Sequence, residues 1–96
     1  MPAYVIAEIE VTDPAVYEGY KKLTPDAIAR YGGRFLVRGG KVDCREGSWS
    51  PERLIVVEFP TMEKARAFYE SPEYAPALAI RKRAARSRLI LVEGIG

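Results

Sequence analysis

Residues 3–14 read AYVIAEIEVTDP and hold the two signals from which the rest of the fold follows. Apolar side chains recur at every second position of residues 3–11, as in a strand that packs one face on a core. Asp13 then provides a capping acceptor for a helix, and Pro14 has the fixed φ that suits a first helical position. This stretch therefore predicts a strand that leads directly into a helix.

Apolar residues at spacings of three and four predict that this first helix extends to Tyr31. Pro25 lacks the N–H donor that a helix interior needs, so we expect either a kink or a second short helix capped by Thr24. Gly32 and Gly33 end the helix, because glycine readily adopts the left-handed backbone found after helix C-termini.

Three further segments rich in apolar and β-branched residues predict strands: 34–38, 53–59 and 88–93. A loop over residues 41–52 separates the first two of them, and capping residues Thr61 and Ser71 start two short consecutive helices. The resulting order is β-α-β-β-α-β, with helices on one face of a four-stranded antiparallel sheet. We therefore expect an α+β chain with a ferredoxin-like sandwich, forming a single domain over residues 1–96.

The residue types that are missing exclude several kinds of site. The chain contains no His, which excludes Ser-His and Cys-His nucleophiles and His-ligated haem or zinc. Its single cysteine, Cys44, cannot form an intrachain disulfide or a thiolate cluster, so we expect no metal, no cofactor and a cytoplasmic location. Cys44 is either an ordinary loop cysteine or a reactive thiol favoured by Arg45, and we expect the former.

The charge balance argues against two classes of partner. A formal net charge of +2 is small for a nucleic-acid-binding chain, and we expect no such partner. The basic cluster at residues 81–88 is either a phosphate-binding patch or a solvated helix C-terminus, and we expect the latter. Apolar runs such as residues 89–92 are far shorter than the roughly 20 residues of a membrane span, and no secretory signal pattern is present.

The second face of the predicted sheet is unusually apolar. Tyr4 and Ile6 stand opposite the core-facing side of the first strand, and Leu54 and Val56 do so in the third. A sheet covered by helices on one side normally turns polar residues outward on the other. An exposed apolar face on so small a domain indicates a partner, so we predict a homodimer that packs sheet against sheet.

Ionisable residues also fall on this second face. Strand alternation places Glu8 and Glu58 there, and Arg38 is a candidate for the same face. Between two packed sheets, carboxylates face either a small-ligand pocket that raises their pKa values or a structural arginine partner. Both alternatives remain open from the sequence, as does a position at a solvated rim.

The string GGRFLVRGG at residues 32–40 is followed by matching segments in the same order along nearly the whole chain: Glu46-Gly47, Arg53, EFPT at 58–61, FY at 68–69, SPEY at 71–74, Arg81 and LVEG at 91–94. With these residues the chain resembles the domain of unknown function 1330 family. The resemblance implies a dimeric α/β barrel, in which ferredoxin-like protomers pair through their sheets. The family has no established activity. Its wider superfamily includes cofactor-free monooxygenases, haem-degrading enzymes, muconolactone isomerases and stress or sensor domains, of which the haem-ligating members do not suit a chain without His.

Carried over by position, the motif residues of the family are Tyr20, Gly33, Arg38, Gly39, Gly40, Glu58, Tyr69, Tyr74 and Arg81. Gly39 and Gly40 are interpreted as points of backbone freedom at a strand end. Arg38 is the strongest functional candidate, because an arginine within a sheet needs a carboxylate from the protein or from a ligand. Arg81 shares a helical stripe with Tyr74, which favours an inward orientation.

These observations support a first hypothesis, in which the chain is a small cytoplasmic dimer that binds a small anionic or polar-aromatic metabolite between sheet and helices, with isomerisation or oxidation of that metabolite as the candidate reactions. The candidate catalytic residues are Glu58 and Arg38, and the candidate ligand-binding residues are Arg38, Glu8, Tyr20, Tyr69, Tyr74 and Arg81. The alternative is a non-catalytic dimerisation or sensor module, with a filled interior and a salt bridge between Glu58 and Arg38.

Overall fold

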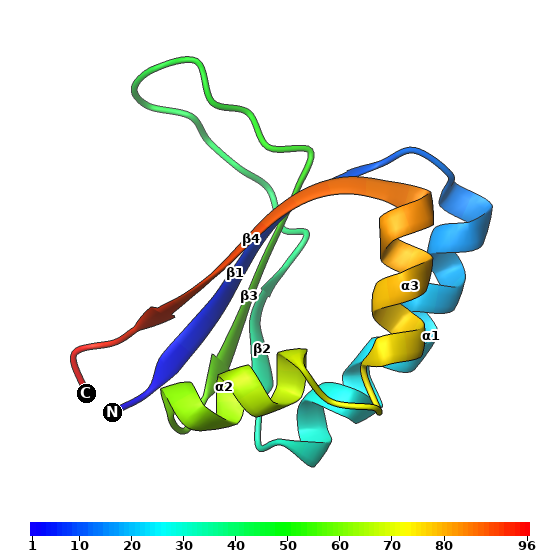
Figure 1. Ribbon diagram of the computed structural model, residues 1–96. Coiled ribbons are helices and arrows are strands. Elements are labelled where there is room, and N and C mark those ends of the chain that lie inside the picture. Colours follow the sequence, from blue (N-terminus) through cyan, green and yellow to red (C-terminus); the bar gives the residue numbers. More distant parts are fainter.

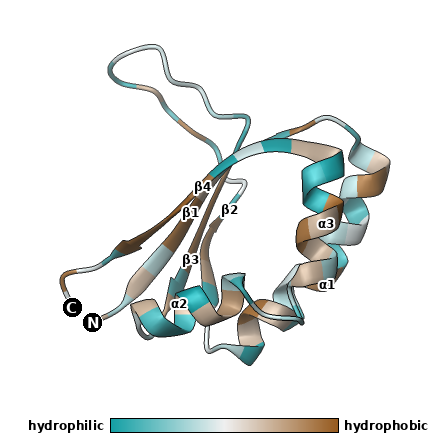
Figure 2. Ribbon diagram, in the orientation of Figure 1, coloured by the Kyte–Doolittle hydropathy of each residue, from teal (hydrophilic) through white to brown (hydrophobic).

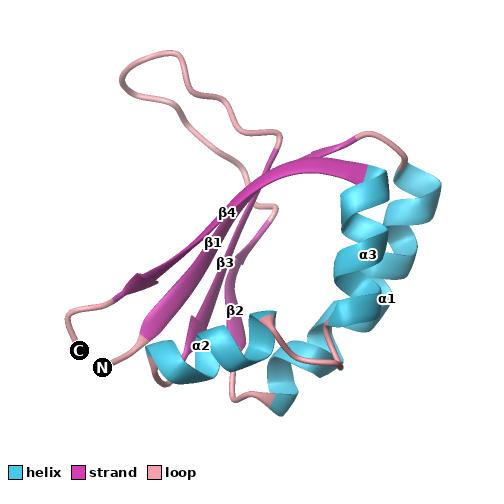
Figure 3. Cartoon of the chain, viewed as in Figure 1, coloured by secondary structure: helices cyan, strands magenta, loops and turns pink.

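The computed structural model describes residues 1–96. Its elements follow one another as β1 (Ala3–Val11), α1 (Pro14–Arg30), β2 (Arg34–Arg38), β3 (Arg53–Phe59), α2 (Met62–Tyr69), α3 (Ala75–Ala84) and β4 (Ala85–Glu93). The four strands form one antiparallel sheet in the order β2-β3-β1-β4, and all three helices lie on the same side of it (Figures 1 and 3). This is the predicted α+β architecture of a ferredoxin-like sandwich, with the second helical segment divided into α2 and α3. No helix combines the length and the apolar character needed to cross a bilayer.

Helix α1 begins as the sequence predicts and continues past its internal proline. The Asp13 side chain accepts a hydrogen bond from the backbone N–H of Val16, which caps the first turn. Pro25 lies inside the helix, and the Thr24 hydroxyl donates to the carbonyl of Tyr20 at 2.6 Å. Thr24 therefore bonds backwards within one continuous helix, and the alternative of a second short helix capped by this residue is wrong.

The two glycines after α1 form a Schellman C-cap. Gly32 has φ of +79°, and its N–H donates to the carbonyl of Ala29 at 3.0 Å. The N–H of Gly33 donates to the carbonyl of Ile28, also at 3.0 Å. This turn brings the chain directly from the end of α1 into β2, where it joins the edge of the sheet.

Side-chain caps also shape the connection between α2 and α3. Thr61 caps α2 by accepting from the N–H of Lys64, as expected from the sequence. The Ser71 hydroxyl donates to the carbonyl of Phe68 at 2.7 Å and accepts from the N–H of Tyr74 at 3.0 Å. Because Ser71 bonds to both sides of the turn, it fixes where the Tyr74 ring enters the core.

Aromatic rings form a continuous line through the space between helices and sheet. Phe59 of β3 contacts Phe68 of α2 with ring centroids 5.1 Å apart, and Phe68 contacts Tyr74 at 4.4 Å. Tyr74 meets Tyr20 of α1 edge-on at 6.2 Å, and Tyr20 stacks on Tyr17 at 5.2 Å. The core thus runs from the centre of the sheet to the first turns of α1, where the candidate site lies.

The face of the sheet away from the helices, called the open face below, carries a row of apolar residues across all four strands. Register places Val37 of β2 beside Val56 of β3, Val56 beside Ile6 of β1, and Ile6 beside Ile90 of β4. Ile90 is 57% exposed although it sits in mid-strand. Figure 2 shows strongly hydrophobic residues towards the C-terminal end of β4. The predicted apolar second face is therefore present.

Candidate functional site

A narrow slot opens between α1 and the β2–β3 side of the sheet, on the helix-facing side. It has a volume of about 20 Å³, room for one water molecule. Its lining consists of aromatic and cationic side chains with one threonine and one isoleucine, and it includes no carboxylate: Tyr17, Tyr20, Lys21, Thr24, Phe35, Arg38, Arg53 and Ile55. A shallow groove of about 310 Å³ lies next to it and shares Tyr17, Lys21 and Arg53 with it. The slot therefore connects to the surface at the start of α1.

Arg53 reaches the slot from the first residue of β3. Its guanidinium carbon lies 5.9 Å from the centroid of the Tyr17 ring, and its Nε is buried without a hydrogen-bond partner. Gly39 packs against it, since a Cβ on Gly39 would lie 2.5 Å from Nη1 of Arg53. The bare backbone of Gly39, whose φ is +72°, thus leaves the space that the guanidinium occupies.

Arg81 lies behind Tyr20, in the last turn of α3, and is only 4% exposed. Its Nη1 donates to the hydroxyl of Ser87, its guanidinium carbon lies 5.9 Å from the Tyr20 ring centroid, and its Nε has no partner. Burial by itself lowers the pKa of Arg81, but the adjacent Tyr74 and Tyr20 raise the pKa by more. Arg81 is therefore a buried cation, and no ion pair with a carboxylate of the chain compensates its charge.

Tyr20 and Tyr17 are held in their protonated form. The hydroxyls of Tyr20 and Tyr74 lie 2.7 Å apart. Burial, and secondly the Tyr74 hydroxyl, raise the pKa of Tyr20, and burial likewise raises the pKa of Tyr17. Both slot-lining tyrosines therefore act as neutral hydrogen-bonding groups near neutral pH.

Arg38 lies on the helix-facing side of the sheet, not on the open face considered in the sequence analysis. The register of β2 against β3 shifts between Phe35 and Val37, which leaves Leu36 as an extra residue in a bulge. Arg38 consequently pairs with Ile55, and its exposed guanidinium lies 4.5 Å from the Phe35 ring centroid. The bulge is the physical reason why simple alternation gives the wrong face for this arginine.

Glu58, the other candidate catalytic residue, lies on the open face, and the sheet separates it from Arg38. Its carboxylate accepts from Nε of Arg34 at 2.8 Å, an ion pair between β3 and β2. Tyr4 donates to the same carboxylate at 3.4 Å. The salt bridge expected between Glu58 and Arg38 is therefore not formed, and the two residues do not share one site.

Glu8 is also on the open face, as predicted, and is paired across strands with Arg88. Nε of Arg88 donates to the Glu8 carboxylate at 2.9 Å, and the indole N–H of Trp49 donates to it at 3.0 Å. These hydrogen bonds, first from Arg88 and then from Trp49, lower the pKa of Glu8. Of the two alternatives left open by the sequence, Glu8 therefore has the structural arginine partner, and its carboxylate pKa is not raised.

Of the predicted ligand-binding residues, the structure groups Arg38, Tyr20, Tyr74 and Arg81 around or directly behind the slot. Tyr69 does not line the slot, and its ring centroid lies 5.9 Å from that of Tyr74. Arg53 was not among the predicted residues. The sequence could have indicated Arg53, because strand alternation puts it on the same face as Ile55 and Val57. This alternation places a cation on the buried face of the sheet.

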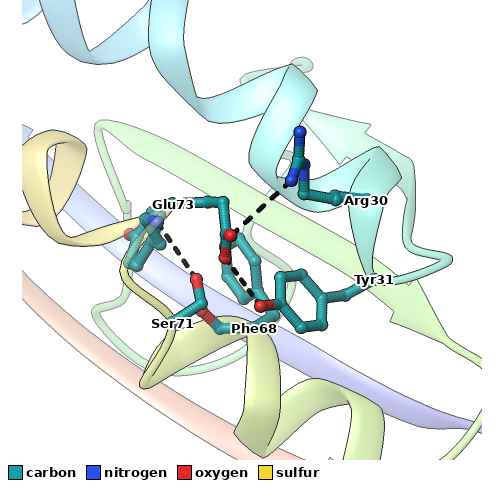
Figure 4. Close-up of polar contacts among 6 residues, drawn as sticks. Arg30, Tyr31, Phe68, Ser71 and Glu73 are labelled. Atoms are coloured by element: carbon teal, nitrogen blue, oxygen red, sulfur yellow. Dashed lines mark hydrogen bonds and ion pairs between the residues drawn. The ribbon is translucent and has the colours of Figure 1, made fainter.

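Figure 4 shows the contacts that hold the end of α1 against the turn before α3. The Tyr31 hydroxyl donates to Glu73 at 2.7 Å, and Arg30 forms an ion pair with the same carboxylate at 3.6 Å. The hydrogen bond from Tyr31 is the main cause that lowers the pKa of Glu73, and the bond to Glu73 is the main cause that raises the pKa of Tyr31. These contacts fix the turn that carries Tyr74.

We expect this arrangement to make stability depend on acid pH through Glu73. Its pKa is lower in the folded chain than its ordinary value of 4.5, so its contribution is present above that pH and is lost as the pH falls through the folded value. Urea unfolding at several pH values should show that Glu73→Gln lowers stability near neutral pH, and that the difference from the wild type shrinks in acid. Glu70→Gln, at an exposed residue of the same turn, is the control, and a difference between wild type and Glu73→Gln that does not vary with pH would contradict the assignment.

The side chains of this chain offer no ready metal site, since no three His, Cys, Asp or Glu residues lie together. The chemistry available at the slot is instead that of guanidinium groups, an ammonium group, hydroxyls and aromatic faces. This set suits recognition of an anion, which the Nε–H group of Arg53, buried and without a partner, would bind.

Several solved structures superimpose on almost the whole chain and share its fold. The methylated RPA0582 protein of Rhodopseudomonas palustris superimposes with a TM-score of 0.80 at 17% identity, covering 99% of this chain and 82% of that one. A dimeric ferredoxin-like protein of unknown function from Jannaschia sp. CCS1 gives 0.76 at 11% identity, over 98% and 100% of the two chains. SnoaB from Streptomyces nogalater, described as a cofactor-independent oxygenase, gives 0.69 at 17% identity, over 99% and 94%. No curated protein matches the chain in sequence.

The architecture and these neighbours place the chain in the class of ferredoxin-like α+β proteins. Two of the neighbouring structures in this class are described as dimeric. Within that class it belongs to the family described as domain of unknown function (DUF1330), whose pattern matches residues 2–95. The resemblance noted in the sequence is thereby confirmed.

Proposed function

We propose that the chain forms a homodimer through its open face, and that each protomer binds a small anionic metabolite in the slot between α1 and the sheet. The observation that carries the ligand proposal is the buried Nε–H group of Arg53, which lines the slot and has no partner. Buried polar groups in folded proteins are nearly always hydrogen-bonded, and buried cations are nearly always paired. An anionic ligand would supply the missing partner.

The dimer proposal rests on the apolar row of the open face, which the ion pairs Arg34–Glu58 and Glu8–Arg88 flank on either side. An apolar centre with a charged rim is the usual anatomy of a protein interface. Neighbouring structures that are described as dimeric support the same assembly.

Binding is proposed here without acid–base catalysis. No carboxylate lines the slot, and Glu8 and Glu58 lie on the opposite face of the sheet in ion pairs. The hydroxyls of Tyr17 and Tyr20 remain protonated near neutral pH, so they serve as donors to a ligand and not as bases. Isomerisation or oxidation of a bound metabolite would need a proton acceptor from the ligand itself or from elsewhere.

A second candidate function is a dimerisation module without a ligand. The observation in its favour is the volume of the slot, which at about 20 Å³ is nearly filled by side chains. The two functions differ in one measurable respect, because only the first makes the stability of the chain depend on small anions.

The test is a thermal unfolding series with acetate, succinate and benzoate, each compared with its uncharged amide at equal ionic strength. At least one carboxylate is expected to raise the Tm of the wild type above its amide, and Arg53→Met is expected to abolish this rise. Arg83→Met changes an exposed arginine of α3 that does not line the slot, and it should retain the rise. If no carboxylate raises the Tm, or if Arg53→Met responds like the wild type, the ligand proposal is overturned and the module is favoured.

A further inference from the structure

We infer that residues 41–52, called the arm below, form part of the dimer interface, and that the ring of Trp49 packs against a second copy of the chain. This inference rests on the proposed homodimer, and it adds to the apolar row of the open face a contact from a different segment. Neither the family description nor the neighbouring structures assign a role to the arm.

The arm is longer than the strands on either side of it require. β2 and β3 pair as far as Arg38 and Ile55, and the N–H of Gly39 donates to the carbonyl of Leu54 at 2.9 Å. The two strand ends are therefore close enough to be joined by a hairpin loop of about 2–5 residues. Figure 1 instead shows the arm projecting beyond the sheet, away from the helices. Long loops without a helix or strand of their own usually have a function.

The arm carries apolar side chains that its own protomer does not bury. Every residue from 41 to 50 is exposed. Trp49 is 56% exposed, and Val42 is 46% exposed. Tryptophan is enriched in the buried centres of protein interfaces, where it often accounts for much of the binding energy. Trp49 is therefore the residue of the arm that gains most from a partner.

Trp49 lies on the open face, directly beside the apolar row. Its indole N–H donates to the carboxylate of Glu8 at 3.0 Å. Glu8 is two residues from Ile6 of the apolar row, and register places it between Leu54 of β3 and Arg88 of β4. The indole is thus anchored to the row of residues next to the apolar one, so the two surfaces are continuous.

The bond to Glu8 also leaves the Trp49 ring ready for burial. A buried indole needs a hydrogen-bond acceptor for its N–H, and Glu8 already supplies one within the same protomer. A partner that covers the ring therefore gains apolar contact without leaving this donor unsatisfied.

A second copy of the chain is the partner that this position fits. Two packed sheets lie about 10 Å apart, so a ring that stands on the open face beside the apolar row reaches the opposite sheet. A two-fold axis makes the contact twice, once from the arm of each protomer. Neighbouring structures described as dimeric support self-association over a different partner.

The experiment uses the fact that Trp49 is the single tryptophan of the chain. Light scattering gives the dissociation constant of the dimer, and tryptophan emission is recorded over the same dilution series. The emission of the wild type is expected to shift to longer wavelength as the dimer dissociates, because the ring returns to water. Trp49→Ala is expected to raise the dissociation constant about a hundredfold, since two copies of an interface tryptophan are lost. Leu23→Ala, which shortens an exposed apolar residue of α1, should leave the dissociation constant unchanged.

The outcomes separate the arm from the proposed dimer. If the wild type dissociates without a shift in emission, or if Trp49→Ala dimerises as tightly as the wild type, the arm contact is overturned while the open-face dimer stands. If the wild type is a single chain at every concentration, the proposed dimer fails as well. If the wild type stays dimeric at every dilution, Trp49→Ala alone decides, with dissociation in the measurable range as the supporting result and a dimer that persists at every dilution as the contrary one. Circular dichroism shows whether each variant has the wild-type fold.

Discussion

Ile90→Asp is expected to reduce the protein from a dimer to single chains of 10.7 kDa. Ile90 ends the apolar row of the open face and is 57% exposed, so in a sheet-to-sheet dimer it becomes buried in both protomers. A two-fold axis introduces the new carboxylate twice, and each buried charge without a partner costs several kcal/mol. The dissociation constant should therefore rise by about a thousandfold or more.

Light scattering coupled to size exclusion at micromolar concentration measures this change directly. The control is Leu23→Asp, which places the same charge at an apolar residue of α1 that is 43% exposed on the opposite side of the molecule. This control should retain the mass of the wild type. A dimeric mass for Ile90→Asp would show that another surface forms the dimer, and a wild-type mass of one chain would remove the dimer altogether.

Gly33→Ala is expected to destabilise the fold strongly, because the added methyl group has no room in the core. An added Cβ would lie 2.6 Å from Cε1 of Phe59 and 2.7 Å from Cγ2 of Ile28, and both of these side chains are buried in the core. Overpacking of this kind costs about 1–3 kcal/mol. For a domain of this length, each kcal/mol lowers the Tm by about 4–8 °C.

Gly40→Ala is the matched control, since nothing lies within 4 Å of the Cβ that it adds. Its free energy of unfolding should remain within about 0.5 kcal/mol of the wild type. Chemical denaturation of the two variants beside the wild type gives the comparison. Equal stability of Gly33→Ala and Gly40→Ala would mean that Phe59 and Ile28 relax at little cost, against the close packing described above.

The fold could be predicted because its signals are local. Alternation in β1, the Asp13-Pro14 helix start and the Gly32-Gly33 stop each depend on a few neighbouring residues, and each is confirmed by the structure. β4 starts at Ala85, earlier than expected, because it follows α3 without a loop. Charged residues at the start of this strand concealed its beginning.

The candidate site could be predicted only in part, because it depends on register. Arg81 and Tyr20 were named from the family resemblance, and helical spacing correctly favoured an inward orientation for Arg81. Arg38 was a candidate for the open face, but the bulge at Leu36, which leaves no pattern in a single sequence, puts it on the helix-facing side. Arg53 was missed because it begins its strand, where a charged residue is ordinarily assumed to be solvated. Partners across the sheet, such as Arg34 for Glu58, likewise follow only from the strand register.

The small volume of the slot also has a kinetic consequence. A space of about 20 Å³ holds only one water molecule, so a small anionic metabolite would bind a minor, wider conformation of the chain. The apparent affinity is then reduced by the fraction of molecules that are open, and any substitution that widens the slot would tighten binding without adding a contact. In rapid-mixing experiments the observed association rate should stop rising at high ligand concentration, where the opening of the protein itself becomes the slow step.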